Sequence, residues 1–292
     1  MKQAFVITAY KNYEGLKSLA KYLSGTCCVY IHVDAASQMI TEEQTKALNE
    51  IPNCVAIRKY AIAWGGFCHV LAINDLIKLA CDNKEVSYIH LLTGEDLPLK
   101  TPKELDQKYL ECKDIFMDVI DSEHFTPQVW KRYSYHNFFP DKNVKNPLLW
   151  QLQNFTVNLQ SLLGMKRTHL GEYQTKDVYK GLVYISMPKN VAEYIVTYVQ
   201  KHPEFMKDLR DCQIPEEFFF QTLLMNSPFK ENIKNKSIRY LNWEKGDGGS
   251  PAYLDLDDLK ILQTSDYDFA RKFHETSSDE LKKALWGKKM LP

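Results

Sequence analysis

Two acidic and two basic residues are the groups in this sequence that are best placed for charge chemistry. Glu216 and Glu217 follow Pro215 where a helix is predicted to begin, and a helix N-terminus stabilises negative charge. That effect alone accounts for Glu216. Glu217 is a candidate general base if this helix end faces a crevice.

Arg271 and Lys272 stand between aromatic residues near the C-terminus. They form either a solvated helix end or a clamp on a phosphate-bearing ligand, which needs fixed positive charge. Asp34 also allows two interpretations, because it follows a predicted buried strand. It either accepts a hydrogen bond from a ribose hydroxyl or a base N–H, or it caps the next turn.

Glu95 and Asp96 follow Thr93-Gly94 at the end of another predicted strand. In an open α/β sheet the ligand crevice lies beyond the carboxyl ends of the strands. This stretch is therefore either a wall of a binding site or a plain polar turn. Pro98 is expected to prevent the strand from resuming.

Glycines follow Trp64, and they would let the backbone approach a ligand. The run is not GxGxxG and no Lys-Ser/Thr follows it, so a phosphate loop is not supported. We favour a tight turn with a packed Trp64. The two D-x-D matches, at 255–257 and 266–268, do not follow core strands, so we assign no metal.

The elements that must position these residues alternate over the first hundred positions. Apolar runs predict buried strands at 5–9, 28–33, 55–57 and 87–93, and apolar residues at helical spacing predict helices between them. Thr41 is the expected N-cap of one helix. This alternation predicts an α/β fold with a mostly parallel sheet and helices on both faces.

The pattern is less regular after residue 102. Strands are predicted at 114–120, 181–186 and 237–243. Helices are predicted at 102–111 and 147–164, and two more begin at Pro188 and Pro215. Loops and short helices are expected over 121–150, and a loop at 246–251. We predict a single domain over 1–292. Its α/β half is 1–120, and the irregular half, 121–292, completes the site.

Charge and composition exclude several classes of protein. Basic and acidic residues number 37 each, so no global field attracts the chain to nucleic acid or to a membrane. The seven scattered cysteines lack metal-ligand spacing and favour a reducing compartment. No apolar run suits a signal peptide or a bilayer span, so we expect a cytoplasmic protein.

In their order, these motifs resemble glycosyltransferase family 14, which contains the core-2 and I-branching β-1,6-N-acetylglucosaminyltransferases and the protein xylosyltransferases. The resemblance covers nearly the whole chain. It rests on the motifs at 4–11, 30–34, 64–66, 91–100, 181–186, 214–217, 239–243 and 269–273.

The resemblance implies a GT-A-like, Rossmann-type fold and inverting transfer from a UDP-sugar without a metal or other cofactor. GlcNAc is the favoured sugar and xylose the alternative. The catalytic base would be Glu217. On the donor side, Asp34 would contact the uridine and Lys272 the diphosphate, with Tyr10 nearby.

The mammalian enzymes use a second diphosphate cation, an arginine, at a position where this chain has none, so Arg239 or Arg271 would take that role. The acceptor side would be formed by Trp243, Trp64, Glu95 and Asp96. The acceptor would be a glycan or glycolipid, bringing a bacterial-type cytoplasmic enzyme to the inner membrane face as a peripheral protein.

Three other classes stay open. A metal-dependent GT-A enzyme would use a carboxylate pair such as Glu95 and Asp96. A glycoside hydrolase would place two carboxylates on either side of the scissile bond. A non-catalytic carbohydrate-binding protein would account for the aromatic residues but not for the cations near Lys272.

Overall fold

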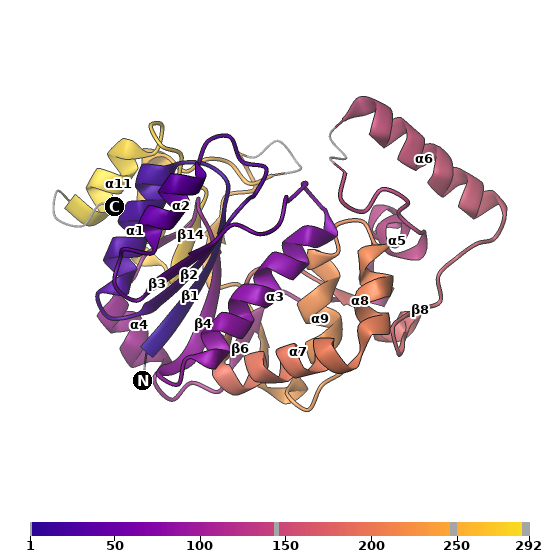
Figure 1. Ribbon diagram of the computed structural model, residues 1–292, viewed down its shortest axis with the longest axis horizontal. Helices are drawn as coiled ribbons and strands as arrows, with labels where there is room; N and C mark the ends of the chain where they lie inside the picture. Colours follow the sequence, from indigo (N-terminus) through magenta and orange to yellow (C-terminus); the bar gives the residue numbers. More distant parts are fainter. Residues whose placement is uncertain (1, 143–145, 246–249, 288–292) are drawn as a thin grey trace.

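The computed structural model describes residues 2–142, 146–245 and 250–287. Its centre is a seven-stranded sheet in the order β12-β6-β11-β4-β1-β2-β3 (Figure 1). Four adjacent strands of this sheet run parallel to one another: β1 (Lys2–Ala9), β2 (Cys28–Val33), β3 (Cys54–Ile57) and β4 (Val86–Thr93). The four strands predicted in the first hundred residues are therefore confirmed.

Helices cover both faces of this sheet because successive side chains of a strand point to opposite sides. Ala4 and Val6 pack in one core with α3 (Phe67–Asp82), α7 (Lys189–Lys201) and α9 (Glu216–Met225). Phe5 and Ile7 pack in the other with α1 (Tyr13–Ser24), α2 (Glu42–Leu48) and α4 (Pro102–Tyr109). The predicted α/β fold with a mostly parallel sheet and helices on both faces is confirmed. Thr41 caps α2 as expected, in a capping box with Gln44.

The later strands extend the sheet, but they depart from the prediction. The strand expected at 114–120 is split into β6 (Ile115–Met117) and β7 (Ile120–Asp121), and β7 pairs with β10 (Tyr179–Lys180) outside the main sheet. The strand expected at 181–186 begins later, as β11 (Ile185–Pro188), antiparallel to β4 and β6. A Cβ on Gly181 would lie 1.9 Å from the Asp118 carbonyl oxygen, so the backbones meet closely there. One edge of the sheet is β12 (Ile233–Asn235), parallel to β6, and the other is β3.

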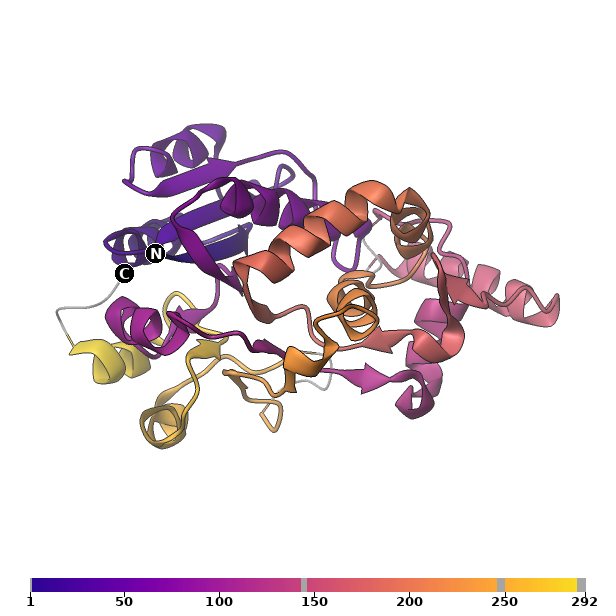
Figure 2. The ribbon, with the colours of Figure 1, turned by 90° about the horizontal axis from the view of Figure 1, so that it is seen from below.

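A second sheet joins segments that are distant in sequence. It contains β13 (Arg239–Leu241), β14 (Phe269–Arg271) and β5 (Leu97–Pro98), with β14 in the middle. The expectation that Pro98 stops the strand is wrong, because Pro98 pairs with Phe269 in β5. Proline is tolerated there because β5 is an edge strand. The C-terminal segment thereby returns to the N-terminal strands (Figure 2), with the rings of Phe5 and Phe269 6.3 Å apart.

The remaining elements lie around this frame. They are α5 (Pro127–Ser134), α6 (Pro147–Leu162), α8 (Pro203–Arg210), α10 (Leu259–Thr264), α11 (Asp279–Trp286), the hairpin β8 (His169–Leu170) with β9 (Tyr173–Gln174), and four 3-10 turns, η1 (Ser122–His124), η2 (Thr175–Asp177), η3 (Lys230–Asn232) and η4 (Leu256–Asp258). Over the described ranges, no helix has the length and apolarity to cross a bilayer. All seven cysteines lie in described parts of the chain and are free thiols. Most of the loop expected at 246–251 lies outside the described residues.

Candidate active site

A cavity of about 460 Å³ opens where the carboxyl ends of β1, β2 and β4 meet the start of α9. This is the position at which open α/β sheets bind ligands, and the volume is typical of a small-molecule site. Most of the predicted site residues line it, namely Tyr10, Asp34, Trp64, Glu95, Glu217, Trp243 and Arg271. Three predicted site residues, Asp96, Arg239 and Lys272, are not among the lining residues.

One side of the cavity, here called the α9 wall, is formed by Glu216 and Glu217 with their partners. Both carboxylates come from the first turn of α9, so the helix end does face a crevice. Oε2 of Glu217 lies 3.1 Å from Nζ of Lys180 and 3.4 Å from a guanidinium nitrogen of Arg132. Both ion pairs are made by the same oxygen of Glu217.

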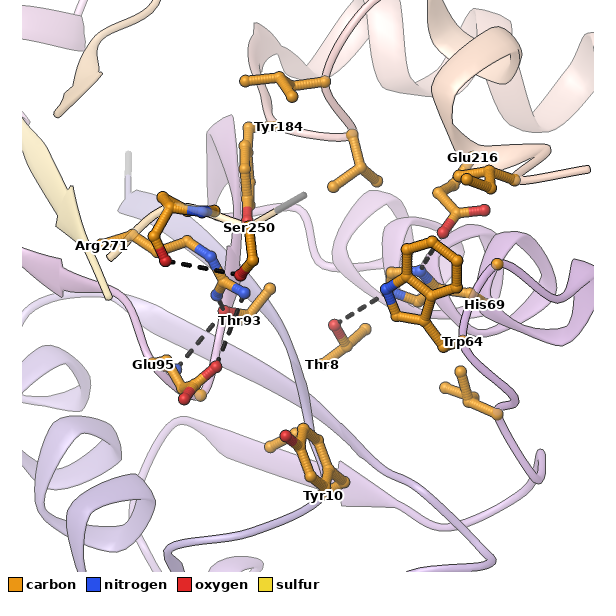
Figure 3. Close-up of a pocket in the computed structure, with 18 of the residues that line it drawn as sticks. Thr8, Tyr10, Trp64, His69, Thr93, Glu95, Tyr184, Glu216, Ser250 and Arg271 are labelled. Atoms are coloured by element: carbon orange, nitrogen blue, oxygen red, sulfur yellow. Dashed lines mark hydrogen bonds and ion pairs between the residues drawn. The ribbon is translucent and has the colours of Figure 1, made fainter. Parts of the chain in front are cut away.

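Glu216 is also part of the cavity surface, beyond its expected role in helix electrostatics. Its Oε1 lies 3.5 Å from Nδ1 of His69, and Nε2 of His69 lies 3.2 Å from the Thr8 hydroxyl (Figure 3). Its Oε2 is buried and has no hydrogen-bond partner among the described residues. A buried carboxylate oxygen without a partner is costly, so a donor group on a ligand would stabilise this wall.

The opposite side, here called the β14 wall, holds positive charge. The Arg271 guanidinium donates to the Thr93 hydroxyl and lies 3.6 Å from Glu95 (Figure 3). It also lies 3.5 Å from Asp96. Lys11 lies 2.9 Å from the other oxygen of Glu95. Burial lowers the pKa of Lys11, but hydrogen bonds to Glu95 and Tyr253 outweigh that effect and raise it above its ordinary value.

Asp96 and Arg239 form a buried ion pair behind the β14 wall. Nε of Arg239 lies 2.6 Å from Oδ1 of Asp96, and both side chains are almost fully buried. Oδ2 of Asp96 accepts hydrogen bonds from the amide and hydroxyl of Thr93, while the guanidinium lies 3.9 Å from the Tyr184 ring centre. The pair joins β13 to the turn after β4, so its contacts are structural and neither side chain reaches the cavity.

Lys272 lies one residue beyond the cavity lining. Its ammonium group donates to the Ser250 hydroxyl, which is in the lining, and lies 4.8 Å from the centre of the Tyr253 ring. The alternative of a solvated helix end is wrong for Arg271 and Lys272, since Arg271 ends a strand and Lys272 follows it.

Asp34 caps the turn after β2, as one of its two interpretations predicts, and its predicted contact with a ribose or base stays a prediction. Its Oδ1 accepts from the amides of Ala36 and Ile62, both at 2.9 Å, so it caps the turn and joins the loops after β2 and β3. It also lines the cavity, where a ligand could reach it. Gly65 has φ +70°, as a tight turn requires, but the expected packing of Trp64 is wrong: the ring is half-exposed in the cavity lining, as is Trp243.

Several residues of this site have no signal in the sequence. Thr8 lies in β1 and His69 in α3, and neither belongs to a motif. Arg132 and Lys180 lie in the less regular half of the sequence, where no periodic pattern marks them. Lys11 lies in the motif at 4–11, but the motif predicts no role for it. The sequence does not show which cations pair with Glu217, because Lys180 and Arg132 are separated from it by 37 and 85 positions.

The acidic turn after β4 is occupied by cations of the chain itself. Asp96 faces Arg239 and Arg271, and Glu95 faces Arg271 and Lys11. Within the described ranges, no group of three or more His, Cys, Asp or Glu side chains is arranged to hold a metal ion.

Several known proteins are similar to this chain. The human N-acetyllactosaminide β-1,6-N-acetylglucosaminyl-transferase is 23% identical over 92% of this chain and 67% of its own length. A xylosyltransferase of Ciona intestinalis is 25% identical over 86% of this chain, which spans only 30% of that protein. Among solved structures, the apo WbbM bifunctional glycosyltransferase covers 95% of this chain and 46% of its own, at 10% identity and a TM-score of 0.37.

A sequence profile of one protein family matches most of the chain. The sequence profile described as "Branch: Core-2/I-Branching enzyme" matches residues 3–266, which include the strand-end turns, both glutamates of α9 and strand β13. The chain therefore belongs to the Core-2/I-branching enzyme family, a family of glycosyltransferases.

Proposed function

We propose that this protein transfers a sugar, with GlcNAc favoured, from a UDP-sugar to a glycan hydroxyl in one inverting displacement. The observation that carries the proposal is the opposition of charge across one cavity. Carboxylates at the start of α9 face a wall that contains Arg271 and Lys11 (Figure 3). Asp34, directly after β2, also lines the cavity.

The proposed reaction needs a base on one side and positive charge on the other. Glu217 accepts the proton of the attacking hydroxyl as the oxygen bonds to sugar C1. The bond from C1 to the diphosphate breaks at the same time, and UDP leaves with the electron pair. General-base assistance is typically worth ~10²–10⁴-fold in rate.

Charge on the departing diphosphate would be stabilised by side chains. Arg271 lies in the cavity lining, and Lys272 is held beside it by Ser250. Of the two arginines considered for the second cation, Arg271 is the better candidate, because Arg239 is buried against Asp96. We infer metal-independent transfer, supported by the pairing of Glu95 and Asp96 with cations of the chain.

The test is a screen of UDP-sugars with excess EDTA and a panel of glycan acceptors. We expect UDP-GlcNAc to be consumed, UDP to be released and a β-linked product to form at an unchanged rate in EDTA. A strict Mn²⁺ requirement would contradict metal independence. Sugar release from a glycan without UDP-sugar would indicate a hydrolase instead.

UDP-xylose is the second candidate donor, because three of the similar proteins are named as xylosyltransferases. The same screen separates the two donors through the product mass. Thermal stabilisation by glycans but not by UDP would favour a non-catalytic carbohydrate-binding protein. Peripheral association with the inner membrane face belongs to this proposal only through the acceptor, which would be a glycan or glycolipid.

A further inference from the structure

Helix α6 (Pro147–Leu162) carries its apolar side chains on the outside of the protein. Both ribbon views place α6 at one end of the long axis of the molecule (Figures 1 and 2). A stripe of large apolar residues repeats every four and three positions along it and is solvent-exposed, with Phe155 at 63% and Leu162 at 82%. This exposed stripe consists of Leu148, Leu152, Phe155, Leu159 and Leu162.

The inner face of α6 contains two buried glutamines beside a buried Val157, whereas an ordinary surface helix buries an apolar stripe. Gln153 and Gln160 are buried, and Gln153 donates to the Asn137 side chain at 3.1 Å. Gln160 exchanges two hydrogen bonds with the backbone of His136, at 2.8 and 3.0 Å. Turning the helix to bury the apolar stripe would break these bonds, so the outward orientation of the stripe is held by the fold.

The exposed apolar surface continues beyond the stripe. Trp150 lies on α6 and is exposed, and Leu163 and Met165 extend the surface past the end of the helix. Contiguous apolar surface of this kind on a folded protein marks an interaction site.

The charges around α6 indicate what the site binds. The thirty residues from 142 to 171 contain four basic residues and no Asp or Glu, although the whole chain is neutral. Of these, Lys142 precedes α6 in the chain and Lys166 follows it, and both are exposed. Arg167 is buried, and Lys145 lies outside the described residues. Cations beside an apolar face with Trp and Phe are the features of a helix that lies in the interface of an anionic membrane.

Other occupants fit less well. Sixteen residues span about 24 Å as a helix, which is shorter than the hydrocarbon core, so α6 suits the plane of a membrane rather than a span. A coiled coil with a second copy of the chain requires three or four heptads, and α6 has only about two. Coiled-coil helices also select their partners through charged residues beside the apolar stripe. The helix itself contains no charged residue.

We propose that α6 docks this protein on the surface of a membrane that contains anionic lipids, with the stripe and Trp150 among the acyl chains and Lys142 and Lys166 near the headgroups. Docking requires no donor or acceptor sugar. It would bring a membrane-borne acceptor to the cavity, a consequence that rests on the proposed function.

The test is flotation of the full chain with phosphatidylcholine vesicles, with and without phosphatidylglycerol. We expect binding at least about ten-fold stronger to the anionic vesicles, weakened by 0.5 M salt because salt screens exposed charge. The double variant Phe155→Glu with Leu162→Glu should bind at least about ten-fold more weakly. A matched control is Leu110→Glu, the same type of change at an exposed apolar residue on α4's C-terminal cap, and it should bind like the wild type.

Quenching by brominated lipids gives a second measurement. Trp150 should be quenched, and Trp150→Phe should remove most of the quenching. Lack of binding to anionic vesicles would overturn the proposal, and so would equal loss in Leu110→Glu. A dimer that sedimentation detects in the wild type and not in the double variant would also overturn it, in favour of a second copy. UDP-sugar turnover with a soluble acceptor should be the same in all variants, so failure of docking and failure of the proposed reaction are distinguishable.

Discussion

The two walls of the cavity use the same kinds of residue in opposite roles. In the α9 wall the carboxylates lie at the cavity and cations hold them from the side, as Lys180 and Arg132 hold one oxygen of Glu217. In the β14 wall the guanidinium of Arg271 lies at the cavity, and it is held by Glu95, which also lines the cavity, and by Asp96 behind it. The proposed base, Glu217, is thus oriented by two cations, and the proposed diphosphate ligand, Arg271, is oriented by two carboxylates.

The walls also differ in how deeply they are supported. The Asp96–Arg239 pair behind the β14 wall is almost fully buried, whereas the partners of Glu217 are partly exposed. We therefore expect changes in the α9 wall to affect turnover, and changes behind the β14 wall to affect folding. Three predictions test this contrast, and one tests the frame that carries both walls.

The largest expected effect is on the α9 wall. Glu217→Gln should reduce kcat by about 10²–10⁴-fold, because the amide cannot accept the proton of the attacking hydroxyl. UDP binding, measured by calorimetry, should remain. The neighbouring Glu216→Gln is the matched comparison and should retain more activity; if Glu216→Gln is the inactive variant, the base is Glu216 and the roles in this wall are reversed.

Next is the support of the β14 wall. Asp96→Asn removes one charge of a buried pair and leaves Arg239 uncompensated, which typically costs about 3–5 kcal/mol of the free energy of unfolding. Denaturation in guanidinium chloride measures this loss. The exposed pair of Asp257 with Lys245 is the control, because Asp257→Asn should change stability by less than about 1 kcal/mol. Equal effects of the two variants would contradict the structural assignment of Asp96.

The frame that carries both walls contains neutral histidines. Burial lowers the pKa of His32 to about 4 and that of His90 to about 3, against 6.5 in the unfolded chain. Between about pH 6.5 and 4 the unfolded state binds more protons, so stability must fall as the pH falls. Two such groups give a slope approaching about 2.7 kcal/mol per pH unit. Urea denaturation at several pH values measures this slope, and a flat profile over that range would show that these histidines titrate normally.

The smallest expected effect concerns Lys272, which is one step removed from the cavity lining. Lys272→Ala should weaken UDP binding by roughly 10- to 100-fold, the size of one charge-assisted hydrogen bond, and should leave uridine binding unchanged. The exposed Lys103 on α4 supplies the control, Lys103→Ala. Unchanged UDP affinity in Lys272→Ala would mean that the diphosphate lies elsewhere, with Arg271 as the next candidate.

Much of the fold could be predicted because the first hundred residues are locally consistent. Each buried strand is a continuous apolar run, and Thr41 supplies a capping box for the helix that follows. The prediction failed where distant partners decide the structure. Pro98 lies in a strand only because β14 arrives beside it, and the run at 114–120 is divided because β10 pairs with its end.

Most residues of the candidate site could be predicted from the sequence, but their individual positions in it could not. The motifs at strand ends and at the start of α9 predict site residues, and most of these residues line one cavity. The sequence does not distinguish Asp96 from Glu95, since adjacent acidic residues of one turn look alike. The structure separates them, because one faces the buried Arg239 and the other faces Lys11 at the cavity.

By itself, the sequence determined the alternation of strands and helices, the polar strand ends and the carboxylates of α9, because these depend on neighbouring residues and on periodicity. Tertiary structure alone decided which charges are paired. Arg132, Lys180 and His69 reach the glutamates of α9 from three separate elements, and Arg239 is buried by segments 143 positions apart in the chain. Pairing energies depend on distance and burial in space, and neither quantity is encoded in the spacing of residues along the chain.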